Sequence, residues 1–434
     1  MTASAARASE DPIARHLLPD TATVGPGGRL AIGGVDVCDL AAELSTPLFI
    51  YDEEHLRTRC REAVAGFPGG VAYATKAFLC LAMARLVEDE GMSLDVASGG
   101  ELHLALSAGV PGARLVLHGN NKSDAELAVA LDRGARIVVD SFDEIARIEA
   151  LIASSRLRAP CAVLVRVTPG VEAHTHEFVR TGQEDSKFGF SLASGAADDA
   201  VGRLRAIAGV EVVGVHAHIG SQILRLEAFA EEVAVLAPFV VRHGLSELCA
   251  GGGLGVAYLA SERAPRIGQW AAGLREAAEA AGLPASVRVS AEPGRSIVAG
   301  AAITCYRVGT IKEIPGIRTY VAVDGGMSDN LRPVLYGSGY EAFLPARADA
   351  RRPRTARVVG KHCESGDVLV SDARLPDDLE VGDVLATPVT GAYGYSMASH
   401  YNRLLRPAVA FVAGGDVRVV CRRETLEDLV RLET

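Results

Sequence analysis

The segment Val71-Ala-Tyr-Ala-Thr-Lys-Ala-Phe78 decides how the rest of the chain is interpreted. Its apolar and aromatic residues predict a short buried strand, and Lys76 stands where that strand ends. On this segment alone two interpretations of Lys76 stay open. Its stem can lie along the surface while the ammonium reaches water. Alternatively, a desolvated lysine with a depressed pKa can hold a carbonyl group as a Schiff base.

Regular alternation of strand-like and helix-like segments begins at this strand. Ser123 and Glu126 form an S-x-x-E capping box at one helix start, and glycines such as Gly134 stand at helix ends. Eight strands alternating with helices predict a (β/α)8 TIM barrel, with a doubly wound open sheet as the alternative. The predicted strands are 71–76, 92–97, 114–118, 136–140, 161–168, 212–219, 247–251 and 287–292, and the predicted helices include 81–90, 101–108, 124–133 and 226–243.

Polar groups at the strand ends favour the barrel over the open sheet. Barrel enzymes build their sites at the C-terminal ends of the strands, so such groups would meet at one mouth. The groups are Lys76, Asp95, His118-Gly-Asn-Asn121, Asp140, Arg166, His218-Ile-Gly-Ser221, Gly251-Gly-Gly253 and Glu292.

The remainder of the chain predicts a second, mainly β domain. Residues 1–20 are expected to form a flexible arm, and residues 21–46 to pack with the β domain. The barrel is predicted over 47–297 and the C-terminal β domain over 298–434. The long polar connection 169–189 is expected to be functional, as connections of this length often are.

Composition narrows the class of protein. Of 434 residues, 49% are hydrophobic and 23% charged, which is typical of a globular enzyme. The net charge of −10 argues against nucleic acid or an anionic membrane as the main partner. The eight cysteines form no C-x-x-C pair, so neither a disulfide framework nor a metal site is indicated. No signal peptide and no apolar run of about 20 residues is present, which predicts a cytoplasmic protein without a membrane partner.

Two glycine-containing motifs follow barrel strands. Gly251-Gly-Gly-Leu-Gly255 is either a flexible turn or a concavity of backbone N–H groups for a phosphate. Glu292-Pro-Gly-Arg295 is either a solvated salt bridge or a site in which Arg295 binds an anion and Glu292 keeps a heterocyclic nitrogen protonated. His218 could stack on a flat ring, and the Ser221 hydroxyl could donate to phosphate.

Two further motifs lie in the predicted β domain. Around Cys363 and Glu364 the chain forms either a polar hairpin or a thiol proton donor beside a carboxylate that binds an ammonium. Tyr393 lies in an aromatic turn or delivers its hydroxyl to a phosphate. Together, a lysine, a glycine concavity, an acidic partner and an arginine suggest pyridoxal phosphate as cofactor.

These motifs resemble the diaminopimelate decarboxylases, from about Leu30 to the C-terminus and closest to the actinobacterial type. Several motifs agreeing in order are specific, whereas any one alone is not. They are Tyr73-Ala-Thr-Lys-Ala77, His118-Gly-Asn-Asn-Lys-Ser123, Val171-Glu-Ala-His-Thr-His-Glu177, His218-Ile-Gly-Ser-Gln222, Glu292-Pro-Gly-Arg295, Asp324-Gly-Gly-Met-Ser-Asp-Asn330, Cys363-Glu-Ser-Gly-Asp367 and Gly391-Ala-Tyr393.

The resemblance implies a fold-type III pyridoxal-phosphate enzyme with an alanine-racemase-like barrel, a C-terminal β domain and a homodimer with shared active sites. Lys76 and Cys363 would be catalytic, the thiol acting as proton donor after loss of carbon dioxide in the partner subunit's site. The implied cofactor-binding residues are Lys76, Asp95, His218, Ser221, Gly253, Glu292, Pro293, Gly294, Arg295 and Tyr393. The implied substrate-binding residues are Arg295, Arg332, Tyr336, Glu364 and Tyr393.

The reaction implied is decarboxylation of meso-diaminopimelate to L-lysine, the last step of lysine biosynthesis. The far end of this substrate carries a carboxylate and an ammonium, for which Arg332 and Glu364 offer opposite charges. A related decarboxylase of ornithine, arginine or carboxynorspermidine is the main alternative, since a diamine-forming enzyme needs only acidic groups there. An amino-acid racemase of the same fold and a non-catalytic homologue that binds a decarboxylase are further alternatives.

Overall fold

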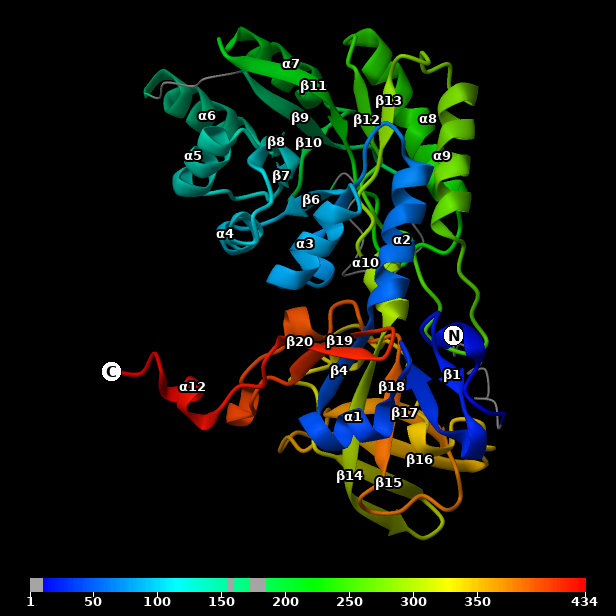
Figure 1. Cartoon of the computed structure of the whole chain (residues 1–434). Coiled ribbons are helices and arrows are strands. Elements are labelled where there is room, and N and C mark those ends of the chain that lie inside the picture. Colours follow the sequence, from blue (N-terminus) through cyan, green and yellow to red (C-terminus); the bar gives the residue numbers. More distant parts are fainter. Residues whose placement is uncertain (1–10, 155–159, 172–184) are drawn as a thin grey trace. The chain divides into compact units, whose positions relative to one another are not determined.

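The computed structural model describes residues 11–154, 160–171 and 185–434 (Figure 1). Two compact units are present in the chain. One consists of residues 59–255 and 265–296, and the other of residues 1–58, 256–264 and 297–434.

Eight parallel strands form the first unit within the described residues. They run in the order β13-β12-β11-β9-β8-β7-β6-β5. A parallel bridge between Val71 and Ala291 brings the last strand beside the first, and the Ala72 N–H donates to the Ala291 carbonyl at 3.0 Å. The sheet therefore closes into the predicted barrel. Its strands are β5 (Ala72–Ala74), β6 (Ser93–Val96), β7 (Leu115–Leu117), β8 (Arg136–Val139), β9 (Cys161–Thr168), β11 (Val210–His216), β12 (Glu247–Cys249) and β13 (Arg288–Ser290), with β10 (Phe190–Ser191) paired to β9.

Helices connect these strands, as their sequence signals predict. In α5 the Ser123 hydroxyl and the Glu126 carboxylate form the expected capping box, and Gly134 ends the helix with φ of 70°. The connecting helices are α3 (Leu81–Asp89), α4 (Gly99–Ser107), α5 (Asp124–Arg133), α6 (Phe142–Ser154), α7 (Ala196–Ala206), α8 (Glu227–Arg242) and α9 (Ile267–Ala280).

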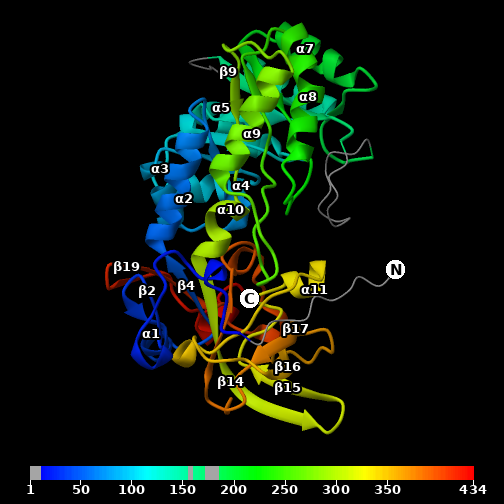
Figure 2. The same cartoon turned by 90° about the vertical axis from the view of Figure 1, so that its right-hand side faces the viewer.

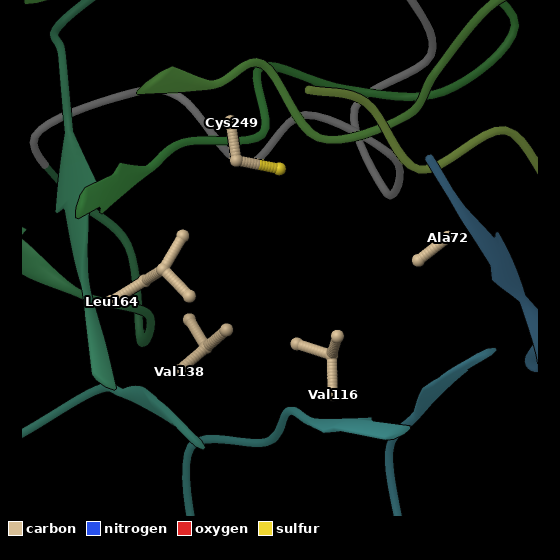
Figure 3. Close-up of a cluster of buried hydrophobic side chains, with 5 residues drawn as sticks. All are labelled: Ala72, Val116, Val138, Leu164 and Cys249. Atoms are coloured by element: carbon tan, nitrogen blue, oxygen red, sulfur yellow. The ribbon is translucent and has the colours of Figure 1, made fainter. Parts of the chain in front are cut away.

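Small and branched apolar side chains fill the barrel interior. Figure 3 shows these side chains pointing toward one another from five different strands, and all five are buried. Such a filled interior leaves the strand ends, rather than a central pore, as the place for a site. The five residues are Ala72, Val116, Val138, Leu164 and Cys249.

The second unit is built on a mixed sheet in the order β17-β16-β15-β14-β4-β19-β20, with β18 paired to β14. The long strand β14, its neighbour β15 and the next strand β16 can be followed in Figure 2. The strands are β4 (Leu48–Asp52), β14 (Ala302–Ile314), β15 (Arg318–Val323), β16 (Arg354–Val359), β17 (Val368–Leu375), β18 (Val384–Pro388), β19 (Ala408–Ala413) and β20 (Asp416–Cys421). Smaller elements are β1 (Thr23–Val24), β2 (Leu30–Ile32), β3 (Val35–Asp36), α1 (Val37–Leu44), α11 (Arg332–Tyr336) and α12 (Leu426–Val430), while α2 (Glu53–Gly66) and α10 (Arg295–Val298) cross the unit limits.

The N-terminal residues contribute to this second unit. Strand β4 is buried along its length and pairs with β14 and β19, and the compact unit that holds the barrel begins at Arg59. The expected N-terminal arm is described from Asp11 onward, where Leu17 and Leu18 are buried. The domain limits inferred from the sequence remain predictions.

Among the described residues, no helix is long and apolar enough to cross a membrane.

A carboxyl group is buried in α8 without a hydrogen-bond partner in the part of the chain that the structure describes. Glu232 is fully buried, and neither of its carboxylate oxygens has a hydrogen-bond partner among the described residues. Burial raises the pKa of Glu232 well above its ordinary value. The side chain is therefore held as the neutral acid in the folded protein.

Glu232→Gln is expected to stabilise the protein, and to do so more as the pH rises. The unfolded chain loses the Glu232 proton above a pH of about 4.3, and the folded chain keeps it. Folding then requires proton uptake, which costs up to about 1.4 kcal/mol per pH unit until the raised pKa is reached. Thermal unfolding of both proteins at pH 5 and pH 8 measures the difference. Glu231→Gln, at the exposed neighbouring position, is the matched control; an equal gain at both pH values would contradict the prediction.

Candidate active site

Lys76 lies in a single 3₁₀ turn, Thr75–Ala77, directly after β5. Hydrogen bonds fix this turn: the Thr75 hydroxyl donates to the Asp95 carbonyl at 2.7 Å, and the Tyr73 hydroxyl donates to the Phe78 carbonyl at 2.7 Å. Lys76 itself is exposed between buried neighbours. Of the two interpretations left open for Lys76, the exposed side chain agrees with the one in which the ammonium reaches water. The amine is accessible at the mouth, where it can react with a ligand carbonyl.

The buried lysine of this unit is Lys122, from the motif that follows β7. Its ammonium donates to the carbonyls of Gly119 and Val138 and to the Glu144 carboxylate, at 2.7–2.8 Å. Three acceptors satisfy its three donors, so Lys122 ties the loop after β7 to β8 and α6. Its role is structural.

Three consecutive glycines follow β12, and backbone from neighbouring loops lies against each of them. A Cβ atom at Gly251, Gly252 or Gly253 would lie 2.3–2.4 Å from a backbone carbonyl oxygen, and Gly251 and Gly253 have φ of +58° and +106°. No other residue fits these positions without displacing backbone. The result is a concavity without side chains, suitable for a phosphate group.

The turn Glu292-Pro-Gly-Arg295 lies against the lysine turn. A Cβ at Gly294 would lie 2.9 Å from both the Cβ and the carbonyl oxygen of Ala74. The Arg295 guanidinium donates to the Ser221 hydroxyl at 2.9 Å, so two of the expected phosphate ligands are brought together. Pro293 and Gly294 are buried, and the Pro293 carbonyl accepts from the Ala74 N–H at 3.2 Å.

Glu292 lies between two imidazoles. Its Oε1 is 3.0 Å from Nε2 of His118, and its Oε2 is 2.9 Å from Nε2 of His216. Burial by itself would raise the pKa of Glu292, but the two histidines lower it well below its ordinary value. Glu292 is therefore an ionised carboxylate, suited to hold a protonated ring nitrogen.

Asp95, at the end of β6, belongs to the same group of buried side chains. Its Oδ1 is 3.6 Å from Nε2 of His118. Burial raises the pKa of Asp95 to about 6, against the opposing influence of His118. The cofactor-binding role expected for Asp95 remains a prediction, and its nearest charged contact is His118.

His118, His216 and Glu292 also have the donor types of a metal site, and their ligand atoms lie within 4.8 Å of one another. However, each imidazole Nε2 is at hydrogen-bond distance from a Glu292 oxygen. A metal would need the lone pairs that these hydrogen bonds occupy. The geometry therefore favours a hydrogen-bonded carboxylate over a metal centre.

His218 is the expected stacking residue. Its Nδ1 accepts from the Gly252 N–H at 3.2 Å, which places the ring beside the glycine concavity. Burial, together with the charges of Lys76 and Arg166, lowers the pKa of His218 well below its ordinary value. Its ring is neutral and flat, as stacking on a heterocycle requires.

Asp140 and Arg166 also lie at the mouth, as their strand ends predict. Their side chains form an ion pair at 3.6 Å, and Asp140 accepts from the Gly189 N–H at 2.8 Å. The Arg166 guanidinium lies 4.1 Å from the centre of the Phe188 ring. These contacts anchor the end of the long connection after β9. Most of that connection, residues 172–184 with the His-Thr-His-Glu part of its motif, lies outside the described residues.

In the second unit Arg332 is buried without an acidic partner among the described residues. Its guanidinium donates to the Tyr340 hydroxyl at 2.5 Å and to the Ser338 hydroxyl at 3.0 Å, and it lies 4.2 Å from the centre of the Tyr258 ring. Its Nε has no hydrogen-bond partner there. Although burial opposes it, the aromatic hydroxyls raise the pKa of Arg332, so the charge is permanent. A buried cation of this kind is a receptor for an anion.

Cys363 and Glu364 are exposed on a loop whose base is rigid. The Asp367 carboxylate accepts from the His362 N–H at 2.9 Å and the Met327 N–H at 2.7 Å. The Tyr401 hydroxyl donates to Glu364. Tyr336 and Tyr393 are half-buried elsewhere in this unit, Tyr393 with φ of 59°.

The predicted residues thus fall into two sets. The barrel unit brings together Lys76, Asp95, His218, Ser221, Gly253, Glu292, Pro293, Gly294 and Arg295, while Arg332, Tyr336, Cys363, Glu364 and Tyr393 belong to the other unit. Sequence reasoning missed His216. Its signal was available, because it lies two residues before His218 and every second residue of a strand shares a face. His118 was recognised at a strand end but was given no role.

Comparison with known proteins agrees with this chemistry. A family model described as "Pyridoxal-dependent decarboxylase, pyridoxal binding domain" matches residues 53–299. The diaminopimelate decarboxylase of Mycobacterium tuberculosis is 46% identical over 442 residues, covering 97% of this chain and 98% of that protein. That of Bacillus subtilis is 45% identical, covering 94% and 95%. The crystal structure of the M. jannaschii enzyme in complex with L-lysine has a TM-score of 0.88 at 32% identity and covers 96% of this chain and 98% of that one.

The chain belongs to the pyridoxal-dependent decarboxylases, enzymes with a fold-type III barrel and a mainly β C-terminal domain. Its similarity over almost the full length is to the diaminopimelate decarboxylases within that family. The resemblance inferred from the motifs is therefore confirmed.

Proposed function

We propose that this chain decarboxylates meso-diaminopimelate to L-lysine and carbon dioxide, using pyridoxal phosphate. The observation that carries the substrate assignment is Arg332, a buried cation with no acidic partner among the described residues. The substrate of a diamine-forming decarboxylase carries only an ammonium at its far end, so such an enzyme does not need this cation. Meso-diaminopimelate presents a carboxylate there.

The barrel residues fit the cofactor. The glycine concavity with Ser221 and Arg295 suits its phosphate, His218 suits its ring face, and Glu292 suits its ring nitrogen. When bound, pyridoxal phosphate supplies an electron sink for the pair left behind by carbon dioxide.

The chain's own groups supply attachment, orientation and the proton. We assign the covalent attachment of the cofactor to Lys76, whose amine is accessible at the mouth. Glu292 holds the ring nitrogen protonated. Cys363 returns a proton to the substrate carbon, and Glu364 binds the distal ammonium. Tyr336 and Tyr393 are assigned to substrate and phosphate, respectively.

We further propose a cytoplasmic homodimer with shared active sites. The exposure of Cys363 and Glu364 on an ordered loop supports this arrangement, since both are then available to a partner subunit's site. Eight free thiols support a reducing compartment.

The test is formation of L-lysine by the purified protein with pyridoxal phosphate. Meso-diaminopimelate, L-ornithine and L-arginine are compared as substrates. L-lysine from meso-diaminopimelate alone is the expected result. Carbon dioxide released only from ornithine or arginine would keep the cofactor assignment and overturn the substrate.

Cys363→Ala is expected to lower kcat by about 10²-fold or more, the usual contribution of a positioned proton donor. Affinity for pyridoxal phosphate should stay unchanged, because no cofactor-binding group is altered. Steady-state turnover and cofactor titration measure the two quantities. Cys38→Ala, a half-buried thiol in α1, is the control. Undiminished turnover in Cys363→Ala would remove the proton-donor role.

A further inference from the structure

Three strands converge on the Glu292 carboxylate. Glu292 follows β13, His118 follows β7, and His216 ends β11. The two rings lie edge to face with centroids 4.9 Å apart, and each contacts a different carboxylate oxygen. All three side chains are buried. A single acidic contact to a ring nitrogen would require Glu292 but neither of the two histidines.

The hydrogen bonding of His216 defines its state. Its Nδ1 is buried and has no hydrogen-bond partner among the described residues. Burial lowers the pKa of His216 to about 4, so the ring is neutral. Its single proton therefore belongs on Nε2, where it is donated to Glu292.

His118 has a different state because a second carboxylate faces it. Its Nε2 lies 3.0 Å from Glu292 and 3.6 Å from Asp95. Burial alone would lower the pKa of His118, but the charges of Asp95 and Glu292 raise it above its ordinary value. The charge of Arg166 lowers the pKa of His118, and the neutral His216 ring lies edge to face with the His118 ring. The second donor to Glu292 is thus held in or near its charged form.

We propose that His118 and His216 are positioning residues that hold Glu292 in one orientation, with both oxygens engaged, for contact with the ring nitrogen of the cofactor. The inference rests on the proposed function. Each carboxylate oxygen keeps a free lone pair for that contact. Because two donors disperse the charge of Glu292, the carboxylate is a weak base, and the shared proton stays on the ring nitrogen.

The test compares a variant that removes the donor with one that keeps it. His216→Leu removes the N–H, whereas His216→Gln retains an amide N–H. In His216→Leu the pKa of Glu292 should rise because one donor is lost, and kcat should fall, by at most about tenfold for each unit of that rise. KM should change little. The visible absorbance of the bound cofactor should titrate at a different pH from that of the wild type, and His216→Gln should restore most of both properties.

Three controls separate this role from a structural one. His103→Leu, at an exposed position of α4, should leave kcat and the absorbance titration unchanged. Thermal unfolding of each variant reports stability. His118→Leu removes the other donor and gives a second measurement if His216→Leu does not fold.

The outcomes are distinct. Unaltered kcat and absorbance in both donor-removing variants would overturn the proposal, as would equal losses in His216→Gln and His216→Leu that follow thermal stability. The absorbance titration needs no substrate. If the wild type forms no L-lysine yet the titration shifts as expected, the proposed function fails and the positioning role stands.

Discussion

Lys76→Ala is expected to lower the rate of L-lysine formation by about 10³-fold or more, a usual fall in rate when a covalent catalytic group is removed. The amine at the end of β5 is the accessible nucleophile of the barrel mouth, and alanine removes it without disturbing the buried turn around it. Thr75 and Tyr73 keep their hydrogen bonds to backbone carbonyls, so the variant should fold normally.

Two measurements check this expectation. Steady-state turnover gives the rate, and reduction with borohydride followed by mass determination shows whether the cofactor is covalently attached. Wild-type protein should retain the cofactor mass and Lys76→Ala should not. Lys312→Ala, an exposed lysine of β14, is the control and should behave as wild type. Steady turnover by Lys76→Ala would refute its assignment as the attachment site.

Arg332→Ala is expected to lower kcat/KM for meso-diaminopimelate. The corresponding loss of transition-state stabilisation should be about 2 to 5 kcal/mol, the range for truncating one partner of a buried charge pair. The loss should fall mainly on substrate binding, because Arg332 is assigned to the distal carboxylate. Arg332→Lys keeps the charge but lacks the planar fork that donates to Tyr340 and Ser338. We therefore expect lysine to restore only part of the activity.

A ligand without a distal carboxylate makes this prediction specific. Binding of L-ornithine, measured as inhibition of L-lysine formation, should not weaken in Arg332→Ala. Tyr340→Phe removes a hydroxyl that accepts a hydrogen bond from Arg332 while leaving the charge of Arg332, and a smaller loss is expected. Arg351→Ala changes an exposed arginine of the same unit and serves as control. Equal losses of meso-diaminopimelate turnover and of L-ornithine binding would mean that Arg332 supports the fold rather than binding the carboxylate.

Much of the barrel could be predicted from local signals. These signals depend only on neighbours in the sequence: the period of the apolar residues, the capping box at Ser123 and the glycine at 134. The structure confirms the helix that they predict. Strand limits were less accurate: the strand predicted over 287–292 is β13, Arg288–Ser290. Its last residues instead turn into the mouth, where Glu292 and Arg295 have other contacts.

Long-range contacts explain what the sequence could not predict. Strand β4 lies before the barrel in the chain, yet its hydrogen bonds are made with β14 and β19, which follow more than 200 residues later. Such contacts also decide the environments of two lysines. Lys122 is buried because the carbonyls of Gly119 and Val138 and the Glu144 carboxylate accept its three hydrogen bonds, whereas Lys76 is exposed.

The sequence by itself determined the class of chemistry, because the order and type of the lysine, glycine, acidic and arginine motifs can be read directly in it. It also determined the alternation of strands and helices that places those motifs at one end of a barrel. The tertiary structure alone decided the state of each group. Whether Glu292 is ionised, His216 is neutral or Arg332 lacks an acidic partner among the described residues depends on which distant side chains surround each group and how far water is excluded. No local sequence pattern records either.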